Sequence, residues 1–292
     1  MTEPDFFDVD VDGGRLRVAR WGAAREVVLG LHGITASSIS LAPLAPVLLP
    51  DRSVVAPDLR GRGGSAALPG PYGLAVHAED CARVLQAVSD TPVTVVGESM
   101  GAYVAILLAA GHPDLVAGVV LVDGGLPLPI PVGDADPDAI VDGLLGPAIE
   151  RLRLTFPSVE AYFDYWRVHP ALSEAWGPDV EAYLRYDLEG DEPMLRSKVS
   201  EAAVRADGRD TIRNVGALDA ALRAVRCPIH LLRATRNLVN AEPPLLPDEA
   251  VAPWRDALPN LVDEVVADTN HYSIIFGDRG RAAVGAAVVG AS

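Results

Sequence analysis

The 292-residue sequence has little positive charge and no long hydrophobic run. Its 24 basic residues stand against 40 acidic ones, which gives a formal net charge of -16, and Lys198 is its only lysine. A surface this acidic repels nucleic-acid phosphates and anionic lipid headgroups, so we expect neither as a partner. The longest apolar stretch, residues 102–110, is too short to span a bilayer.

Cysteine is also scarce. The only two, Cys81 and Cys227, suggest no metal-ligand set, and we expect both thiols to stay reduced. We expect neither a metal nor a cofactor. Residues 1–12 are acidic and hold no apolar run, unlike a secretory signal. The sequence therefore predicts a cytoplasmic protein, and it leaves a homodimer open.

Apolar residues make up 49% of the chain, enough to bury a sizeable core. Short apolar runs bounded by turn residues recur, a pattern typical of a parallel sheet covered on both faces. The expected strands are residues 27–31, 53–56, 93–96, 119–122, 229–232 and 261–266, with 15–21 as an edge strand. Helical spacing marks residues 74–88, 100–110 and 281–289. Strand–helix alternation predicts a doubly wound α/β sheet.

The alternation breaks between residues 126 and 225, where aromatic residues gather and no convincing strand occurs. We expect a helical cap over residues 126–225, inserted after the sixth strand into an α/β core of residues 1–125 and 226–292. A proline-rich run, residues 127–131, separates the cap from the sheet. Some of four cap aromatics are expected to line a substrate pocket: Tyr162, Trp166, Trp176 and Tyr183.

The pentapeptide Gly97–Gly101 (GESMG) follows an expected buried strand and opens an expected buried helix. A serine on such a tight turn has strained backbone angles. The turn requires glycine two residues before and two residues after the serine, because side chains at those positions would clash. The turn lifts the hydroxyl above the sheet and places it at a helix N-terminus, where the dipole favours developing negative charge. We therefore predict that Ser99 is a nucleophile.

With this motif in its context, the chain resembles the α/β-hydrolase superfamily along essentially its whole length. Three further segments match the family's motifs in order and spacing: residues 31–34 (LHGI), 58–65 (DLRGRGGS) and 270–272 (NHY). The resemblance implies an α/β-hydrolase fold, with a mostly parallel, doubly wound sheet of about eight strands and an inserted helical cap. It also implies a serine hydrolase that forms an acyl-enzyme.

The resemblance assigns the oxyanion hole to the backbone N–H groups of Ile34 and Met100, which would stabilise charge on the carbonyl oxygen. His32, in the same loop, is expected to brace it. Of the six histidines, His271 follows the last strand at the carboxyl edge of the sheet, where open α/β sheets gather their ligands. It also fits the family's order of serine, acid and histidine. We expect His271 to be the base that activates Ser99.

The position of the acid that would orient His271 departs from the family pattern. Most members carry it after the strand that follows the cap, where this chain has Asn237, and a neutral amide cannot stabilise the histidine cation by charge. Some members use the end of the strand that precedes the cap, where Asp123 lies one helix and one strand after Ser99. We predict Asp123 as the acid. Three residues of the later loop stay open as alternatives: Asn237, Glu242 and Asp248.

A lid over the sheet edge creates the largest cavity of this fold. The leading hypothesis is a carboxylesterase or lactonase with a small, mostly apolar ester or lactone as its substrate. Ser99 argues against epoxide hydrolases and dehalogenases, because those relatives use an aspartate there. Three alternatives stay open: hydrolysis of a carbon–carbon bond or thioester by the same triad, a non-catalytic ligand-binding protein, and a cofactor-free oxygenase.

Overall fold

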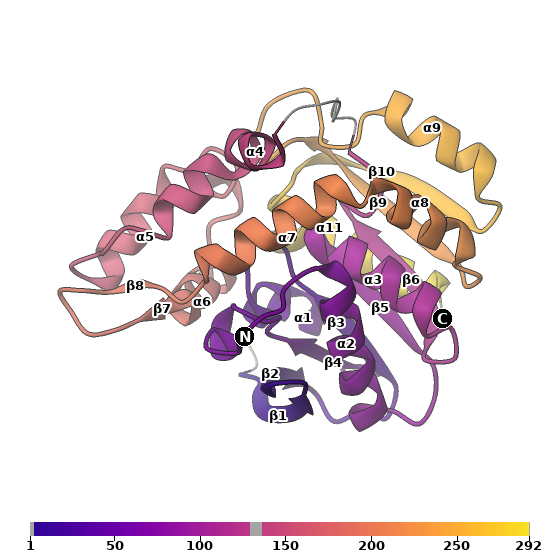
Figure 1. The fold of residues 1–292 in the computed structure, drawn as a ribbon, viewed down its shortest axis with the longest axis horizontal. Helices are drawn as coiled ribbons and strands as arrows, with labels where there is room; N and C mark the ends of the chain where they lie inside the picture. The colour runs from indigo at the N-terminus through magenta and orange to yellow at the C-terminus, as the bar shows by residue number, and fades with distance from the viewer. Residues whose placement is uncertain (1–2, 129–135, 292) are drawn as a thin grey trace.

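A computed structural model describes residues 3–128 and 136–291 (Figure 1). Its main sheet has eight strands in the order β1-β2-β4-β3-β5-β6-β9-β10. The strands are β1 (Asp5–Val11), β2 (Gly14–Trp21), β3 (Val27–Leu31), β4 (Ser53–Pro57), β5 (Val93–Glu98), β6 (Val116–Val122), β9 (Ile229–Arg236) and β10 (Leu261–Asn270). β2 is antiparallel to both of its neighbours, and every other pair is parallel. The expected mostly parallel α/β sheet of about eight strands is confirmed.

One strand prediction is wrong. The edge position expected for residues 15–21 belongs to β1, and β2 lies between β1 and β4. β1 alternates between buried Val9 and Val11 and exposed acidic residues, which is the period of a half-buried strand. The acidic residues of β1 fill its exposed positions, so its composition alone does not indicate a strand.

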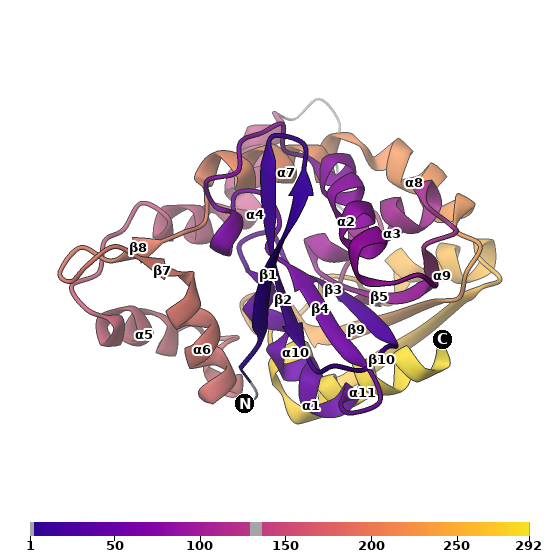
Figure 2. The same ribbon diagram turned by 90° about the horizontal axis from the view of Figure 1, so that it is seen from below.

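Helices lie on both faces of the sheet (Figure 2), and each face has its own core. One face is covered by α2 (Leu74–Val88), α3 (Met100–Gly111) and α8 (Val215–Ala224). The other is covered by α1 (Ala45–Leu48), α10 (Ser273–Phe276) and α11 (Asp278–Gly290). Successive strand residues point to opposite faces, so Val95 of β5 packs in the first core and Val96 in the second. Parallel strands buried on both faces account for the continuous apolar runs of the sequence.

The segment between β6 and β9 is mostly helical. It contains α4 (Pro137–Arg151), α5 (Val159–Arg167), α6 (Pro178–Asp187) and α7 (Glu201–Arg213), followed by α8. It also contains a short hairpin that the sequence did not predict, β7 (Leu188–Glu189) with β8 (Arg196–Ser197). In both views α5, α6 and this hairpin lie to one side of the main sheet (Figures 1 and 2).

The division into a core and a cap over residues 126–225 stays a proposal. Leu218 and Leu222 of α8, near the end of that segment, pack in the core with α3. Of the proline-rich run 127–131, only the first two residues belong to the described chain, and residues 129–131 lie outside it. None of the helices in the described ranges has both the length and the apolar character that crossing a membrane requires.

A buried ionic cluster ties α7 to the core. Asp207 Oδ2 lies 2.5 Å from Arg62 Nη1 and 3.0 Å from His77 Nε2, and all three side chains are fully buried. Burial by itself would raise the pKa of Asp207, but the charges of His77 and Arg62 and their hydrogen bonds lower it. Since Arg62 belongs to the loop after β4 and His77 to α2, this cluster joins three separate segments.

Candidate active site

Ser99 lies on the turn between β5 and α3, with φ 53° and ψ -116°. This left-handed conformation is strained for a residue with a side chain. The turn is possible because its flanking glycines pack against backbone. A Cβ on Gly97 would lie 2.3 Å from the carbonyl oxygen of Gly101, and one on Gly101 would lie 2.1 Å from that of Leu31. The two glycines expected from the motif are therefore required by the close approach of the backbone.

His271 and Asp123 meet from two different strands. His271 follows β10 and Asp123 follows β6, and His271 Nδ1 lies 2.7 Å from Asp123 Oδ2. The other carboxylate oxygen of Asp123 accepts a hydrogen bond from the backbone N–H of Ala234 at 3.1 Å, and the aspartate is fully buried. Burial alone would lower the pKa of His271, but the hydrogen bond and charge of Asp123, with the charge of Glu98, raise it. The pair is thus suited to stabilise an imidazolium cation.

The three alternatives for the acid lie elsewhere: Asn237, Glu242 and Asp248. Asn237 closes a turn, since its Oδ1 accepts the backbone N–H groups of Val239 and Ala241 at 3.0 and 3.1 Å. Asp248 is paired with two arginines, and Glu242 is exposed. Among these four candidates in the described chain, only Asp123 contacts His271.

The two expected oxyanion donors lie beside Ser99. Ile34 and Met100 line the same cavity as the serine hydroxyl. Within the described ranges, neither backbone N–H donates a hydrogen bond to another group. The carbonyl of Ile34 points the opposite way, because it accepts hydrogen bonds from Arg62 Nε at 3.0 Å and Nη2 at 2.9 Å. Arg62 therefore fixes the orientation of the loop that carries Ile34.

His32 braces this loop from the inside. Its Nε2 accepts the backbone N–H of Leu59 at 3.0 Å, which leaves Nδ1 to donate to the carbonyl of Gly33 at 2.8 Å. Burial lowers the pKa of His32 to about 3, so the ring is neutral at physiological pH. The structural role expected for His32 matches this geometry.

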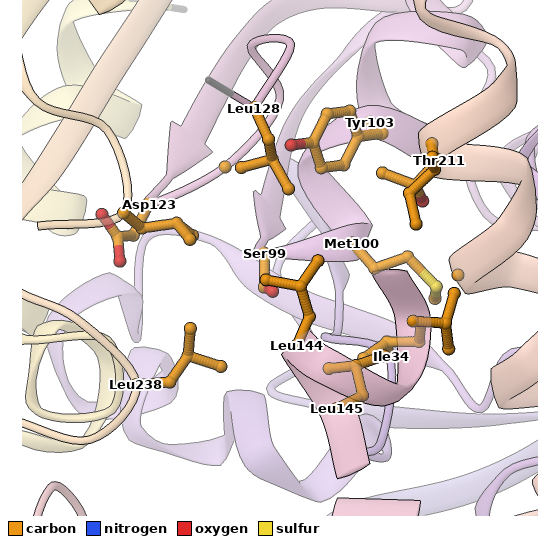
Figure 3. A pocket seen from close by; sticks show the side chains of 15 residues that line it. Ile34, Ser99, Met100, Tyr103, Asp123, Leu128, Leu144, Leu145, Thr211 and Leu238 are labelled. Carbon is orange, nitrogen blue, oxygen red and sulfur yellow. The ribbon is translucent and has the colours of Figure 1, made fainter. Parts of the chain in front are cut away.

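A cavity with two arms surrounds Ser99. The first arm has an almost entirely apolar lining (Figure 3). Its two hydroxyl groups other than that of Ser99 are already bonded: Tyr103 donates to the carbonyl of Leu126 at 2.9 Å, and Thr211 donates to that of Asp207 at 2.9 Å. Asp123 also lines this arm, and most of the other contacts are made by aliphatic side chains, among them Leu128, Val141, Leu144, Leu145 and Ile212. This arm suits an alkyl or aryl group.

The second arm is more polar. His271 lines it together with Glu98, His169, Tyr183 and Tyr272. Tyr183 is thus the one residue of the four expected cap aromatics that reaches the cavity in the described chain. His271 lines only this second arm, whereas Ser99 and Ile34 line both.

The other three cap aromatics pack within the cap segment. The hydroxyl of Tyr162 donates to Asp187 at 2.5 Å, and the Trp166 ring lies under the guanidinium of Arg151. Trp176 donates from its indole N–H to Glu181 at 3.1 Å. Their positions were predicted from the clustering of aromatics alone, which does not distinguish a residue that supports the cap from one that faces the substrate.

Glu98 is a site residue to which sequence reasoning gave no role. Its Oε1 lies 3.4 Å from His271 Nε2, and its side chain is 13% exposed. Its Oε2 lies against Gly33, where a Cβ would come within 2.6 Å of it. Burial raises the pKa of Glu98 to about 7, opposed by His271 and reinforced by Asp123. The available signal was its position directly before Ser99, because the same turn brings both residues to the sheet edge.

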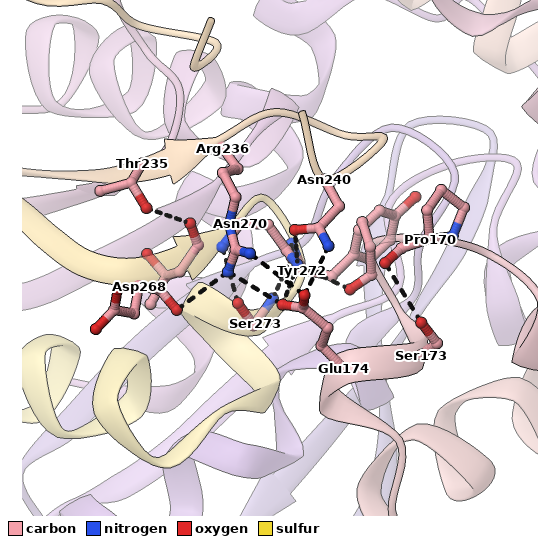
Figure 4. A network of polar contacts seen from close by, with 12 residues as sticks. Pro170, Ser173, Glu174, Thr235, Arg236, Asn240, Asp268, Asn270, Tyr272 and Ser273 are labelled. Carbon is pink, nitrogen blue, oxygen red and sulfur yellow. Dashed lines mark hydrogen bonds and ion pairs between the residues drawn. The ribbon is translucent and has the colours of Figure 1, made fainter. Parts of the chain in front are cut away.

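A hydrogen-bond network holds the residue before His271 (Figure 4). Asn270 Oδ1 accepts the backbone N–H of Ser273 at 2.9 Å, which starts the helix after the base. Its Nδ2 donates to the carbonyl of Ala171 at 3.0 Å and to Asn240 Oδ1 at 3.1 Å. Asn240 in turn donates to Glu174 at 2.7 Å. The network connects the loop of His271 to the cap segment and to the loop after β9.

Comparison with known proteins assigns the family. The model of the alpha/beta hydrolase fold matches residues 26–278, and the chain belongs to that family. A crystal structure of E-2-(acetamidomethylene)succinate hydrolase superposes with a TM-score of 0.80 at 23% identity, covering 99% of this chain and 98% of the other. A thioesterase domain from the curacin biosynthetic pathway gives 0.77 at 18% identity, covering 99% and 100%. At these identities the likeness shows the fold.

Two curated relatives match over shorter stretches. Lipase LipV of Mycobacterium tuberculosis is 39% identical over 114 residues, which is 39% of this chain and 43% of the relative. The 2-(acetamidomethylene)succinate hydrolase of Mesorhizobium japonicum is 34% identical over 125 residues, or 42% and 45%. This chain thus spans less than half the length of the curated relatives it matches. Both of these relatives are named as hydrolytic enzymes.

Proposed function

We propose that this protein is a serine hydrolase that cleaves a carboxylic ester or lactone through an acyl-enzyme. The observation that carries the proposal is the pairing of His271 with Asp123 at 2.7 Å, in the cavity where Ser99 lies at its strained turn. A nucleophile, a base and a buried acid that orients the base form the arrangement that serine hydrolysis requires.

In the proposed mechanism, Ser99 attacks the carbonyl carbon while His271 Nε2 takes the hydroxyl proton. Asp123 holds the ring through Nδ1 and stabilises the imidazolium. The N–H groups of Ile34 and Met100 bind the oxyanion, each contributing about 3 kcal/mol by analogy with measured donors. His271 then protonates the leaving oxygen, and water hydrolyses the acyl-enzyme by the same steps.

The apolar first arm supports an ester or lactone with an alkyl or aryl acyl group. Such a group gains about 25 cal/mol for each Å² of apolar surface that it buries. Among the described residues of this arm, Ser99 has the one polar side chain without a partner, since Tyr103 and Thr211 bond to backbone carbonyls and Asp123 bonds to His271. The name of the related lipase agrees with an acyl group of this kind.

A fluorophosphonate probe followed by mass spectrometry tests the proposal. We expect covalent labelling at Ser99, and we expect Ser99→Ala to lose both labelling and hydrolysis of p-nitrophenyl esters and lactones by at least 10³-fold. Ser89→Ala, at the exposed end of α2, is the matched control and should keep full activity. Folded protein that is neither labelled nor active toward any ester or lactone would overturn the proposal.

A further inference from the structure

The positions of the base and of the two arms define which part of a substrate each arm receives. The leaving oxygen must take its proton from His271 Nε2, so the leaving group has to lie next to that nitrogen. His271 lines the second arm and is not among the residues that line the first. The second arm is therefore the leaving-group arm, and the apolar first arm receives the acyl group.

Among the described residues that line the leaving-group arm, Glu98 is the one acidic side chain. Glu98 lines it with its carboxyl 3.4 Å from His271 Nε2. In the described parts of the chain, neither a lysine nor an arginine lines either arm. Residues 129–135 add none, because no basic residue occurs there in the sequence. A carboxylate in this arm would lie beside Glu98 without a counter-charge, and juxtaposition of like charges is strongly unfavourable.

Two tyrosines of this arm add a second feature that favours a cation, although most of its other lining residues are aliphatic. Tyr183 and Tyr272 present aromatic rings, whose faces attract an ammonium group. Burial raises the pKa of both phenols, that of Tyr272 to about 12, so they stay neutral. Burial lowers the pKa of His169, so this ring adds no positive charge that would repel an ammonium.

We propose that Glu98 is a specificity-determining residue that favours leaving groups bearing an ammonium group and disfavours those bearing a carboxylate. The inference rests on the proposed function, because it assumes that Ser99 and His271 cleave an ester. Glu98 would contact the leaving group directly, through the oxygen that faces His271.

The preference depends on the ionisation of Glu98. The groups that face it are His271, Asp123, Tyr272 and the backbone N–H of Gly33. Of these, His271 and the N–H of Gly33 favour the carboxylate, and Asp123 opposes it. Because burial raises the pKa of Glu98 to about 7, its negative charge develops as pH rises through neutrality. The preference for an ammonium leaving group should grow over the same range.

Three hexanoate esters with leaving groups of similar length test the inference: 4-aminobutyl, pentyl and 4-carboxybutyl. At pH 8.5 we expect kcat/KM of the wild type to be about tenfold higher for the ammonium ester than for the pentyl ester, and at least tenfold lower for the carboxylate. In Glu98→Gln both ratios should move toward one. Glu264→Gln, an exposed residue of β10, removes the same charge away from the cavity and should leave both ratios unchanged.

The pH series of the wild type is an independent measurement that needs no variant. The ratio of kcat/KM for the ammonium ester to that for the pentyl ester should rise between about pH 6 and pH 8.5. Hydrolysis of all three esters with equal ratios in wild type and Glu98→Gln, or with a ratio that does not change with pH, would overturn the inference. Failure of the proposed function is distinguishable, because then none of the esters is cleaved and Ser99 is not labelled.

Discussion

At the scale of single residues, the site is built from strained backbone and buried charge. Ser99 and Asp123 both have positive φ, 53° and 47°, although neither is glycine. The two turns press against each other, since a Cβ on Gly124 would lie 2.4 Å from the carbonyl oxygen of Ser99. Such strain persists only where the surrounding structure holds it, and it is common at catalytic sites. Here the loop of Asp123 lies against the loop of Ser99.

Substitution of the two candidate acids should separate them. Asp123→Asn removes the charge that stabilises the imidazolium, so we expect kcat to fall by about 10³ to 10⁴. Asn237→Ala breaks only the turn of the loop after β9, and kcat should change by less than about fivefold. Steady-state kinetics of both variants with one p-nitrophenyl ester checks this. The opposite ranking, with both proteins folded by circular dichroism, would contradict the assignment of Asp123.

Glu98 should also affect stability in a pH-dependent way. Its ordinary pKa is 4.5, and burial raises it to about 7 in the folded protein, so the folded state binds more protons between these values. Stability is then lost as pH rises through that window. Glu98→Gln should leave the unfolding free energy unchanged at pH 4.5 and increase it by about 1–3 kcal/mol at pH 8. Urea unfolding of both proteins at the two pH values measures the change in unfolding free energy. An equal change at pH 4.5 and pH 8 would contradict the prediction.

At the scale of elements, the ionic cluster of Asp207 couples α7 to the loop that carries Ile34. Asp207 on α7 binds Arg62, and Arg62 binds the carbonyl of Ile34. A shift of α7 would therefore move the peptide that we assign to oxyanion binding. The same helix also lines the first arm of the cavity, through Gly208, Thr211 and Ile212.

Asp207→Asn tests this coupling. The variant leaves Arg62 buried without its counter-ion, so we expect a loss of about 3–5 kcal/mol in unfolding free energy. We also expect a lower kcat with little change in KM, because the oxyanion loop loses its support. Arg209→Gln is the control on the same helix. It breaks an ion pair with Asp138 that is partly exposed, which should cost less than about 1 kcal/mol and leave kcat unchanged.

At the scale of the whole molecule, the net charge of -16 opposes compactness. A chain so far from neutrality repels itself, and dissolved salt screens this repulsion over about 10 Å at 0.1 M. The acidic residues are spread along the entire sequence, so the effect belongs to no single element.

Salt should therefore stabilise the protein at neutral pH. We expect the melting temperature at pH 8 to rise by roughly 2–4 °C between low salt and about 0.5 M NaCl, which corresponds to about 1 kcal/mol. At pH 5 protonation of carboxylates reduces the net charge, and the increase should shrink or vanish. Scanning calorimetry at both pH values measures the salt-induced rise in melting temperature. A larger rise at pH 5 than at pH 8 would argue against self-repulsion as its cause.

Spacing along the chain was enough to predict the layered fold and two candidate site residues, Ser99 and His271. Strands such as β3 and β5 are buried on both faces, so they read as continuous apolar runs whatever their neighbours are. The Ser99 turn could be predicted because its two glycines are a local requirement of the backbone. His271 followed from its place after the last strand. These features depend on spacing along the chain.

Contacts between segments that are distant in the sequence could not be predicted in this way. The hydrogen bond between Asp123 and His271 joins residues 148 positions apart, and β9 lies between their strands in the sheet. The contact of Glu98 with His271 and the bond from Arg62 to Ile34 likewise join separate elements. Clustered aromatics did not reveal that only Tyr183, of the four expected, reaches the cavity in the described chain. Side-chain direction and the approach of separate loops arise from packing, which spacing along the chain does not specify.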